Sequence, residues 1–312
     1  MKIGLIADDF TRINLELEPG LIVRNLTPAM LPFDLLRNLD CILVESAWRG
    51  YLNTWKGKIA RYENKASTWL ITLLKIARLR GIKTVFWNKE DPVSFDRFKH
   101  LCEYFDVVLT TEEELIPEYK KMVDKRVVVE SQSFFFQPHL HNSAKNDDAK
   151  ESEEILFCGG LYKSEFPDRF ARLDMAVTAL KNENIVVFDR FSSGDSSWES
   201  VFYENVIKKE SFAYKQSKQY YQAGFAHLNV NSVDGSRTMF SRRMLELIAC
   251  GSKVIDLTNF KNKSILSDFV IQASNKDEVR DALDRNMPNI DHTYIRENYS
   301  VASFIKRLKS YR

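Results

Sequence analysis

The sequence predicts an α/β protein with two doubly wound domains, each a parallel sheet covered by helices on both faces. Short apolar runs rich in β-branched residues alternate with amphipathic segments, as is typical of parallel strands buried between helices. The length of 312 residues corresponds to about two domains. A polar, aromatic-free stretch at 141–154, HNSAKNDDAKESEE, separates two such alternating series and is the best candidate for a linker.

In the first half, each expected strand is a short apolar run and each expected helix has amphipathic spacing. The expected strands are Ile3–Ala7, Cys41–Val44, Thr84–Trp87, Val107–Thr110 and Val127–Val129. The expected helices are Pro32–Asn38, Lys65–Arg80, Phe95–Tyr104 and Glu112–Met122. We therefore expect an N-terminal domain at 1–142 and a linker at 143–154.

The same alternation restarts after the linker. The expected strands are Ile155–Cys158, Ile185–Phe188, Ala226–Val230 and Lys253–Asp256. The expected helices are Asp168–Lys181, Phe202–Lys208, Arg243–Ala249 and Lys276–Asn286. We expect a C-terminal domain at 155–295. In the last segment, 296–312, we expect a helix over Tyr299–Tyr311 that packs back on the first domain.

Composition excludes several classes of protein. With 45 basic and 43 acidic side chains the formal charge is +2, which does not favour a dedicated nucleic-acid binder. The 11 glycines are about half the usual ~7% share, so a glycine-rich phosphate loop is not favoured. Cys41, Cys102, Cys158 and Cys250 are far apart and have no metal-ligand spacing. We expect four reduced core thiols.

The opening segment, MKIGLIADDF, reaches acidic residues too early for a secretory signal, which needs an apolar region of ~7–15 residues. No stretch approaches the ~20 apolar residues of a membrane span. We therefore expect a cytoplasmic protein, and the sequence leaves open a peripheral contact with the inner face of the membrane.

Polar and aromatic side chains follow successive strands of the first domain. Because ligands of open parallel sheets bind at the carboxyl ends of the strands, these residues are candidates for a binding site. They are Asp8, Asp9, Glu45, Ser46, Trp48, Trp87, Asn88, Lys89, Glu90, Asp91, Thr110 and Thr111. Such mixtures bind sugars, since carboxylates and amides bond hydroxyls and indole rings cover C–H patches. An open alternative for single residues is structural: Asp8 or Asp9 caps a helix, and Asp91 begins a turn before Pro92.

In the second domain, Gly159 and Gly160 follow a strand, where a backbone that approaches a ligand closely would need glycine. An ordinary turn is the alternative. The segment Ser236–Gly251 is more informative. Ser241 is a plausible N-cap, and the cations Arg242 and Arg243 in the following turn oppose the helix dipole. Cations in that position indicate a bound anion, and a diphosphate fits.

One turn further along the same helix, Glu246 is suited to accept hydrogen bonds from a ribose diol, and Gly251 then supplies the helix C-cap. The alternative is that Arg242 and Arg243 form ordinary surface ion pairs.

Several blocks occur in order over roughly residues 1–270: Asp9-Phe10-Thr11, Val44 to Gly50, Phe86 to Pro92, Phe105-Asp106 through Thr110-Thr111, Phe157-x-Gly159-x-x-Tyr162 with Pro167-x-Arg169, Phe188-Asp189-Arg190 and Ser236 to Gly251. Together these blocks resemble CgeB-like (spore maturation protein type) bacterial glycosyltransferases. The resemblance implies a GT-B glycosyltransferase: two Rossmann-like domains with a cleft between them, the nucleotide-sugar donor in the C-terminal one, the acceptor in the N-terminal one and no metal.

The resemblance and the chemistry of the residues together give a set of expected donor-binding residues. They are Gly159, Gly160, Tyr162, Arg169, Asp189, Arg190, Asn229, Asn231, Ser232, Thr238, Ser241, Arg242, Arg243 and Glu246. Many retaining GT-B enzymes carry two glutamates eight apart in this segment. Here Thr238 occupies the first position, so the stereochemistry stays open. No two aspartates are separated by one residue, in agreement with a metal-free enzyme.

The expected reaction transfers a sugar from a nucleotide sugar, with a UDP-sugar as the expected donor, to a hydroxyl of a cell-surface glycan, teichoic acid or lipid-linked acceptor. If the reaction inverts, it needs a general base near that hydroxyl. Asp9 is the first candidate, Glu90 or Asp91 the next, and Glu45 a further one. The expected acceptor-binding residues are Trp48, Trp87 and Asn88.

Two other functions stay open. A non-catalytic two-domain protein that closes on a ligand would have the same architecture. A transferase that glycosylates nucleic acid would need a basic flank, for which the candidates are Lys56, Lys58, Arg61, Lys75, Arg78 and Arg80. The same flank could hold anionic lipid-linked acceptors at a membrane surface, or be the solvated face of an amphipathic helix. The oligomeric state also stays open.

Overall fold

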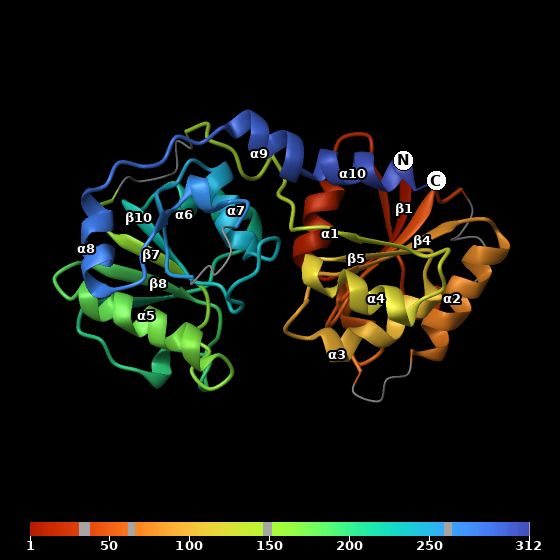
Figure 1. The fold of residues 1–312 in the computed structure, drawn as a ribbon, viewed down its shortest axis with the longest axis horizontal. Coiled ribbons are helices and arrows are strands. Elements are labelled where there is room, and N and C mark those ends of the chain that lie inside the picture. The colour runs from red at the N-terminus through yellow and green to blue at the C-terminus, as the bar shows by residue number, and fades with distance from the viewer. Residues whose placement is uncertain (31–37, 62–65, 146–151, 259–263, 312) are drawn as a thin grey trace. The chain divides into compact units, whose positions relative to one another are not determined.

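The computed structural model describes residues 1–30, 38–61, 66–145, 152–258 and 264–311. The chain forms two compact units, one made of Met1–Gln137 with Tyr299–Arg312 and the other of Pro138–Asn298. Figure 1 shows a sheet flanked by helices in each unit. Of the expected elements, the helix at Pro32–Asn38 (all but Asn38) and residues 146–151 of the linker lie outside the described residues.

The first unit contains a six-stranded parallel sheet with the order β2-β1-β3-β4-β5-β6. The strands are β1 (Lys2–Ile6), β2 (Ile22–Asn25), β3 (Cys41–Glu45), β4 (Lys83–Asn88), β5 (Val107–Thr110) and β6 (Val128–Ser131). Strands β1 and β3 to β5 are almost wholly buried, as their continuous apolar runs predict. The strand order reverses between β1 and β3, which makes this pair the topological switch point.

Helices cover this sheet. They are α1 (Asp9–Glu16), α2 (Thr68–Leu79), α3 (Phe95–Phe98), α4 (Ile116–Met122) and α10 (Val301–Ser310). Ser67 caps α2 by accepting a hydrogen bond from the backbone N–H of Leu70 (3.2 Å). Helix α10 belongs to this unit because Phe304 stacks on Phe135 with 4.6 Å between ring centres. The Arg307 guanidinium of the same helix also pairs with Glu130 at 2.5 Å.

The second unit contains a six-stranded parallel sheet with the order β12-β11-β10-β7-β8-β9. Its strands are β7 (Ile155–Cys158), β8 (Ile185–Asp189), β9 (Val206–Glu210), β10 (Ala226–Asn229), β11 (Val254–Asp256) and β12 (Ile271–Gln272). Its helices are α5 (Pro167–Ala179), α6 (Ser217–Tyr221), α7 (Arg242–Ala249), α8 (Lys276–Asp284) and α9 (His292–Tyr299). This strand order is that of the Rossmann fold, and its switch point lies between β7 and β10.

These two sheets confirm the doubly wound α/β architecture that the sequence predicts. One expected element is wrong: the helix at Phe202–Lys208 is instead a loop followed by β9. Residues Val206–Glu210, VIKKE, are mostly exposed, because β9 is an edge strand and lacks the apolar run of a buried one. Of the other edge strands, β6 was expected, whereas β2 and β12 were missed: β2 is also partly exposed, and β12 has only two residues. Within the described residues, no helix is both long and apolar enough to cross a membrane.

Candidate active site

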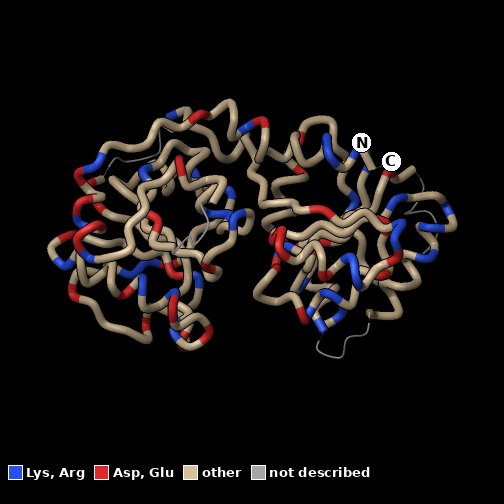
Figure 2. The backbone as a smooth tube through the Cα atoms, in the orientation of Figure 1, with Lys and Arg blue, Asp and Glu red and all other residues tan. Residues whose placement is uncertain are grey.

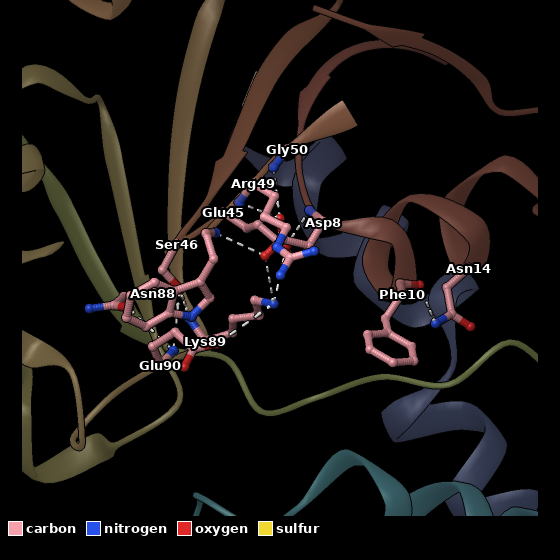
Figure 3. Close-up of polar contacts among 11 residues, drawn as sticks. Asp8, Phe10, Asn14, Glu45, Ser46, Arg49, Gly50, Asn88, Lys89 and Glu90 are labelled. Carbon is pink, nitrogen blue, oxygen red and sulfur yellow. Dashed lines mark hydrogen bonds and ion pairs between the residues drawn. The ribbon is translucent and has the colours of Figure 1, made fainter. Parts of the chain in front are cut away.

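A polar cluster lies at the switch point between β1 and β3. The backbone N–H of Asp8 donates to Glu45 Oε1 at 2.6 Å. The Asp8 carboxylate in turn accepts hydrogen bonds from three successive backbone N–H groups, those of Trp48 (2.9 Å), Arg49 (3.0 Å) and Gly50 (2.8 Å). Figure 3 labels Asp8, Glu45, Arg49 and Gly50 of this cluster. Asp8 precedes α1 but makes no side-chain cap bond to it. Its role is therefore to hold the loop after β3.

Lys89, which follows β4, joins this cluster; it was among the polar residues expected at the strand ends, but no role was expected for it. Its ammonium lies 3.3 Å from Glu45 Oε1 and 3.7 Å from carboxylate oxygens of Asp8 and Glu90. Burial raises the pKa of Glu45, although Lys89 opposes that shift. Burial also favours a higher pKa at Asp8. There, however, Lys89 and the three backbone N–H groups together outweigh burial, so the pKa of Asp8 is lowered. The site thus places one ammonium among three carboxylates.

The four carboxylates considered as a general base differ in exposure. Asp9 has a side chain that is 73% exposed and pairs with Arg12 at 2.9 Å. Glu90 is 28% exposed, and its backbone N–H donates to the Ser46 hydroxyl at 3.2 Å. The other two, Glu45 and Asp91, are both 0% exposed. Of these four carboxylates, those of Asp9 and Glu90 are therefore the two that reach the surface of this unit.

Asp91 lies inside a buried hydrogen-bond network. It accepts hydrogen bonds from the Asn88 amide (2.7 Å), the Thr110 hydroxyl (2.6 Å) and the Tyr119 hydroxyl (2.8 Å). Burial nonetheless raises the pKa of Asp91 to about 7. Asn88 is also fully buried, so this pair joins the loop after β4 to β5 and α4 from within the core.

The two tryptophans occupy different environments. Trp87 is 1% exposed and stacks on Phe135 with 5.1 Å between ring centres, so its ring belongs to the core beneath α10. Trp48 is partly exposed, and the Arg97 guanidinium lies 5.1 Å from its ring centre. Of the two expected sugar platforms, Trp48 is the one near the surface.

In the second unit, Arg243 of α7 spans the switch point between β7 and β10. Its guanidinium donates to the carbonyl oxygen of Cys158, at the end of β7, and to Asn229 Oδ1, at the end of β10 (2.9 Å). The same guanidinium lies 4.8 Å from the centre of the Phe157 ring. A Cβ atom on Gly159 would come within 2.7 Å of Arg243 Nη1, so glycine at this position lets the guanidinium approach.

A hydrogen-bonded chain continues from Arg243 along the end of β10. Asn229 Oδ1 also accepts from the Ser241 hydroxyl (2.9 Å), and Asn229 Nδ2 donates to Asp256 (2.8 Å). The side chain of Asn231 accepts from the backbone N–H of Ser241 at 2.9 Å. Ser241 itself accepts from the backbone N–H of Met244, which confirms it as the N-cap of α7.

Three buried N–H donors around this chain have no hydrogen-bond acceptor among the described residues. They are Arg172 Nε, Asn231 Nδ2 and Arg243 Nε. Arg172 and Asn231 are in contact, since Arg172 Nη2 donates to the Asn231 carbonyl at 3.4 Å. A buried unpaired donor costs about 1–3 kcal/mol, so three in one neighbourhood indicate a site for a ligand rich in acceptor atoms. One acceptor, Asp256 Oδ2, is also unpaired, and burial raises the pKa of Asp256 to about 6.

Positive charge gathers at this site. Arg169 of α5 is 4% exposed and donates to the Leu161 carbonyl at 2.7 Å. Burial, with a contribution from Arg243, lowers the pKa of Arg169 to about 9. In the part of the chain that the structure describes, no carboxylate forms an ion pair with Arg169 or Arg243, whereas Arg172 pairs with Asp234 at 2.5 Å. Arg172 was missed, although it lies three residues after Arg169 and hence on the same helix face.

Tyr162 has a backbone φ of +57°, which is uncommon for a residue other than glycine and is often found near functional sites. Arg169 lies 5.1 Å from the centre of its ring. Close to Tyr162, Gly160 gives room to the Phe191 ring, with which a Cβ would collide. These contacts shape the loops after β7 and β8.

Glu246 lies in an interior position. It is 2% exposed and accepts hydrogen bonds from the hydroxyls of Tyr214 (2.5 Å) and Tyr221 (3.2 Å). Arg242 Nε lies 3.6 Å from Glu246 Oε1. The two adjacent arginines therefore diverge: Arg242 pairs within its own helix, as the ion-pair alternative expects, and Arg243 extends to the ends of β7 and β10.

The remaining expected donor residues are Asp189, which ends β8, and three residues in loops that follow strands of this sheet. Asp189 accepts from the backbone N–H of Phe191 (3.0 Å), the Ser197 hydroxyl (2.7 Å) and the backbone N–H of Trp198 (3.1 Å), and so fixes its own loop. The other three residues are Arg190, Ser232 and Thr238. Ser232 is exposed and Thr238 is 9% exposed, while the Arg190 guanidinium lies 5.9 Å from the Phe191 ring centre.

Among residues 1–30, 38–61, 66–145, 152–258 and 264–311, no group of three or more His, Cys, Asp or Glu side chains is placed to hold a metal ion.

No known family model matches this sequence, and no curated protein sequence matches it. Solved structures do. An α-glucosyltransferase in complex with UDP and a 13-mer DNA containing an HMU base has a TM-score of 0.65 at 12% identity, over 100% of this chain and 99% of that one. AviGT4, a glycosyltransferase involved in avilamycin A biosynthesis, has a TM-score of 0.59 at 12% identity, over 100% of this chain and 96% of that one.

Anabaena Alr3699/HepE, in complex with UDP and glucose, has a TM-score of 0.58 at 12% identity, over 99% of this chain and 90% of that one. The chain spans only 54% of the length of TarM, which it also resembles. At such identities the likeness concerns the fold alone. Two six-stranded parallel sheets with these strand orders, matched over whole chains, identify the fold as that of the GT-B glycosyltransferases.

Proposed function

We propose that this chain is a metal-independent glycosyltransferase of the CgeB-like type, which transfers a sugar from a UDP-sugar to a hydroxyl of a glycan acceptor. One observation carries the proposal: Arg243 spans the β7–β10 switch point, and its Nε is one of three buried N–H donors there that lack acceptors, with Arg172 Nε and Asn231 Nδ2. This is the position at which doubly wound sheets bind nucleotides. A diphosphate is anionic and rich in acceptor oxygens, so it matches both the charge and the donors.

The donor would bind in the second unit. Arg243 and Arg169 would stabilise the charge of the UDP leaving group, with further hydrogen bonds from the side chains of Arg172 and Asn231. The ribose diol would bond Glu246, because each carboxylate oxygen accepts about two hydrogen bonds and Tyr214 and Tyr221 supply one each. Asp189 and Gly160 would act indirectly, by fixing the loops around the sugar.

The acceptor would bind in the first unit, at the end of the sheet where Asp8, Glu45 and Lys89 meet. Asp9 and Glu90 remain the candidates for the general base, because their carboxylates are exposed and a base must reach the acceptor hydroxyl. Glu45 and Asp91 would support the site from within the core. For the acceptor itself we propose a hydroxyl of a cell-surface glycan, teichoic acid or lipid-linked saccharide.

The test is a turnover assay with the full chain. UDP release would be measured from UDP-glucose, UDP-galactose and UDP-N-acetylglucosamine, with and without polysaccharide, teichoic acid or DNA acceptors. We expect slow release without acceptor, faster release with the correct acceptor, and loss of both in Arg243→Gln. Nucleotide binding without release from any nucleotide sugar would instead indicate a non-catalytic binding protein. Failure to bind any nucleotide would contradict the donor site.

A further inference from the structure

The outward face of α2 exposes large apolar side chains. The inward face buries Leu70, Leu73 and Leu74 in the core of the first unit. On the outside, Trp69 is 50% exposed and Leu79 is 87% exposed. Isolated exposed apolar residues are normal. Here, however, a tryptophan and a leucine are exposed on the solvent-facing side of one helix, and exposed apolar groups of this kind are typical of interaction surfaces.

The same helix carries only positive charge. Lys75 and Arg78 are exposed, and Arg80 follows directly after the helix. No residue of α2 is acidic, so its segment in Figure 2 is coloured only blue and tan. No carboxylate of the described residues forms an ion pair with Lys75 or Arg78. The helix dipole accounts for a cation in the last turn, such as Arg78, but not for Lys75 or for the exposed Trp69 and Leu79.

We propose that this face of α2 docks on an anionic lipid bilayer. Basic residues beside apolar ones on one helix surface are the pattern of helices that lie in the membrane interface. Cations are attracted to acidic headgroups, a tryptophan ring is favoured at the level of the headgroups, and Leu79 gains from leaving water. A phosphate backbone of nucleic acid would attract the two cations but would offer no apolar layer to Leu79.

Docking on lipid does not depend on the proposed transferase activity, so an experiment can contradict one of the two proposals and leave the other standing. The test is flotation of the full chain with vesicles of equal parts phosphatidylglycerol and phosphatidylcholine, against vesicles of phosphatidylcholine only. We expect binding to the anionic vesicles that weakens as salt is raised. Lys75→Gln with Arg78→Gln should lower the partition coefficient roughly 25-fold, at about fivefold per charge. Leu79→Ser should lower it roughly tenfold.

The control is Lys120→Gln with Lys121→Gln, which removes two exposed charges from α4 of the same unit and should change binding less than about twofold. Thermal unfolding of each variant checks that it is folded. The proposal is overturned if the wild type does not float with anionic vesicles, or if the α4 pair weakens binding as much as the α2 pair. Binding of a DNA duplex without binding of vesicles would also overturn it, and would assign the face to nucleic acid.

Discussion

The Arg243 guanidinium donates a hydrogen bond to Asn229 Oδ1 over 2.9 Å, which ties the start of α7 to the end of β10. Because its other arm reaches the end of β7, a single side chain connects the two strands between which the sheet order reverses. The proposed donor site is built around this connection.

The first prediction concerns Gly159. In Gly159→Ala the new Cβ would lie 2.7 Å from Arg243 Nη1, so the guanidinium must move. We expect the free energy of unfolding to fall by about 1–3 kcal/mol and UDP affinity to fall with it.

Gly251→Ala is the matched control, since Gly251 has a left-handed φ of +74° but no atom closer than 3.5 Å to a Cβ. It should lose about 1 kcal/mol and keep its UDP affinity. Urea unfolding and nucleotide titration measure both effects, and equal affinity in the two variants would refute the prediction.

The second prediction concerns Asp91. Its pKa is raised to about 7 in the folded protein, above the usual value of about 4 in an unfolded chain. The folded state therefore binds the proton more tightly, and the contribution to stability is complete below about pH 4 and lost as the pH rises to about 7. The whole contribution of Asp91 to the free energy of unfolding is about 4 kcal/mol. Asp91→Asn should remove this slope, as measured by urea unfolding between pH 4 and pH 8. In Asp277→Asn, where the carboxylate is 87% exposed, the slope should stay.

The third prediction concerns Lys89. Lys89→Met leaves the buried Glu45 and its acidic neighbours without the ammonium, so we expect a loss of about 3 kcal/mol of unfolding free energy at pH 8. The loss should be smaller at pH 4, because protonation removes the uncompensated charge, and Glu45→Gln in the same chain should restore part of it. Lys99→Met removes a surface partner of Asp96 and should cost less than about 1 kcal/mol. A pH-independent loss in Lys89→Met would contradict the role given to this lysine.

Much of the fold was predictable because each buried parallel strand corresponds to a continuous run of apolar residues in the sequence. Ile3–Ala7 and Ile185–Phe188 were expected and correspond to β1 and β8. The edge strand β9 lacks this signal, because three of its five residues are charged and most of the strand is exposed. The N-cap at Ser241 was predictable since capping is local chemistry.

The candidate site was less predictable because its contacts depend on which strands are neighbours. Asp8, Glu45 and Lys89 follow three different strands, and only the order β1-β3-β4 brings them together. Trp87 was expected at an acceptor site. It instead packs on Phe135 and Phe304, the second of which comes from the far end of the chain. Local sequence carries no information about such partners.

The most direct measurement is calorimetric titration of the full chain with UDP, comparing the wild type with Arg243→Lys. A lysine cannot make the two-armed contact of the guanidinium. We expect the wild type to bind UDP and Arg243→Lys to bind it at least tenfold more weakly, about 1.4 kcal/mol. Arg296→Lys, at an exposed position of α9, should be unchanged. No UDP binding by the wild type, or equal affinity in all three proteins, would contradict a nucleotide-sugar site at the β7–β10 switch point.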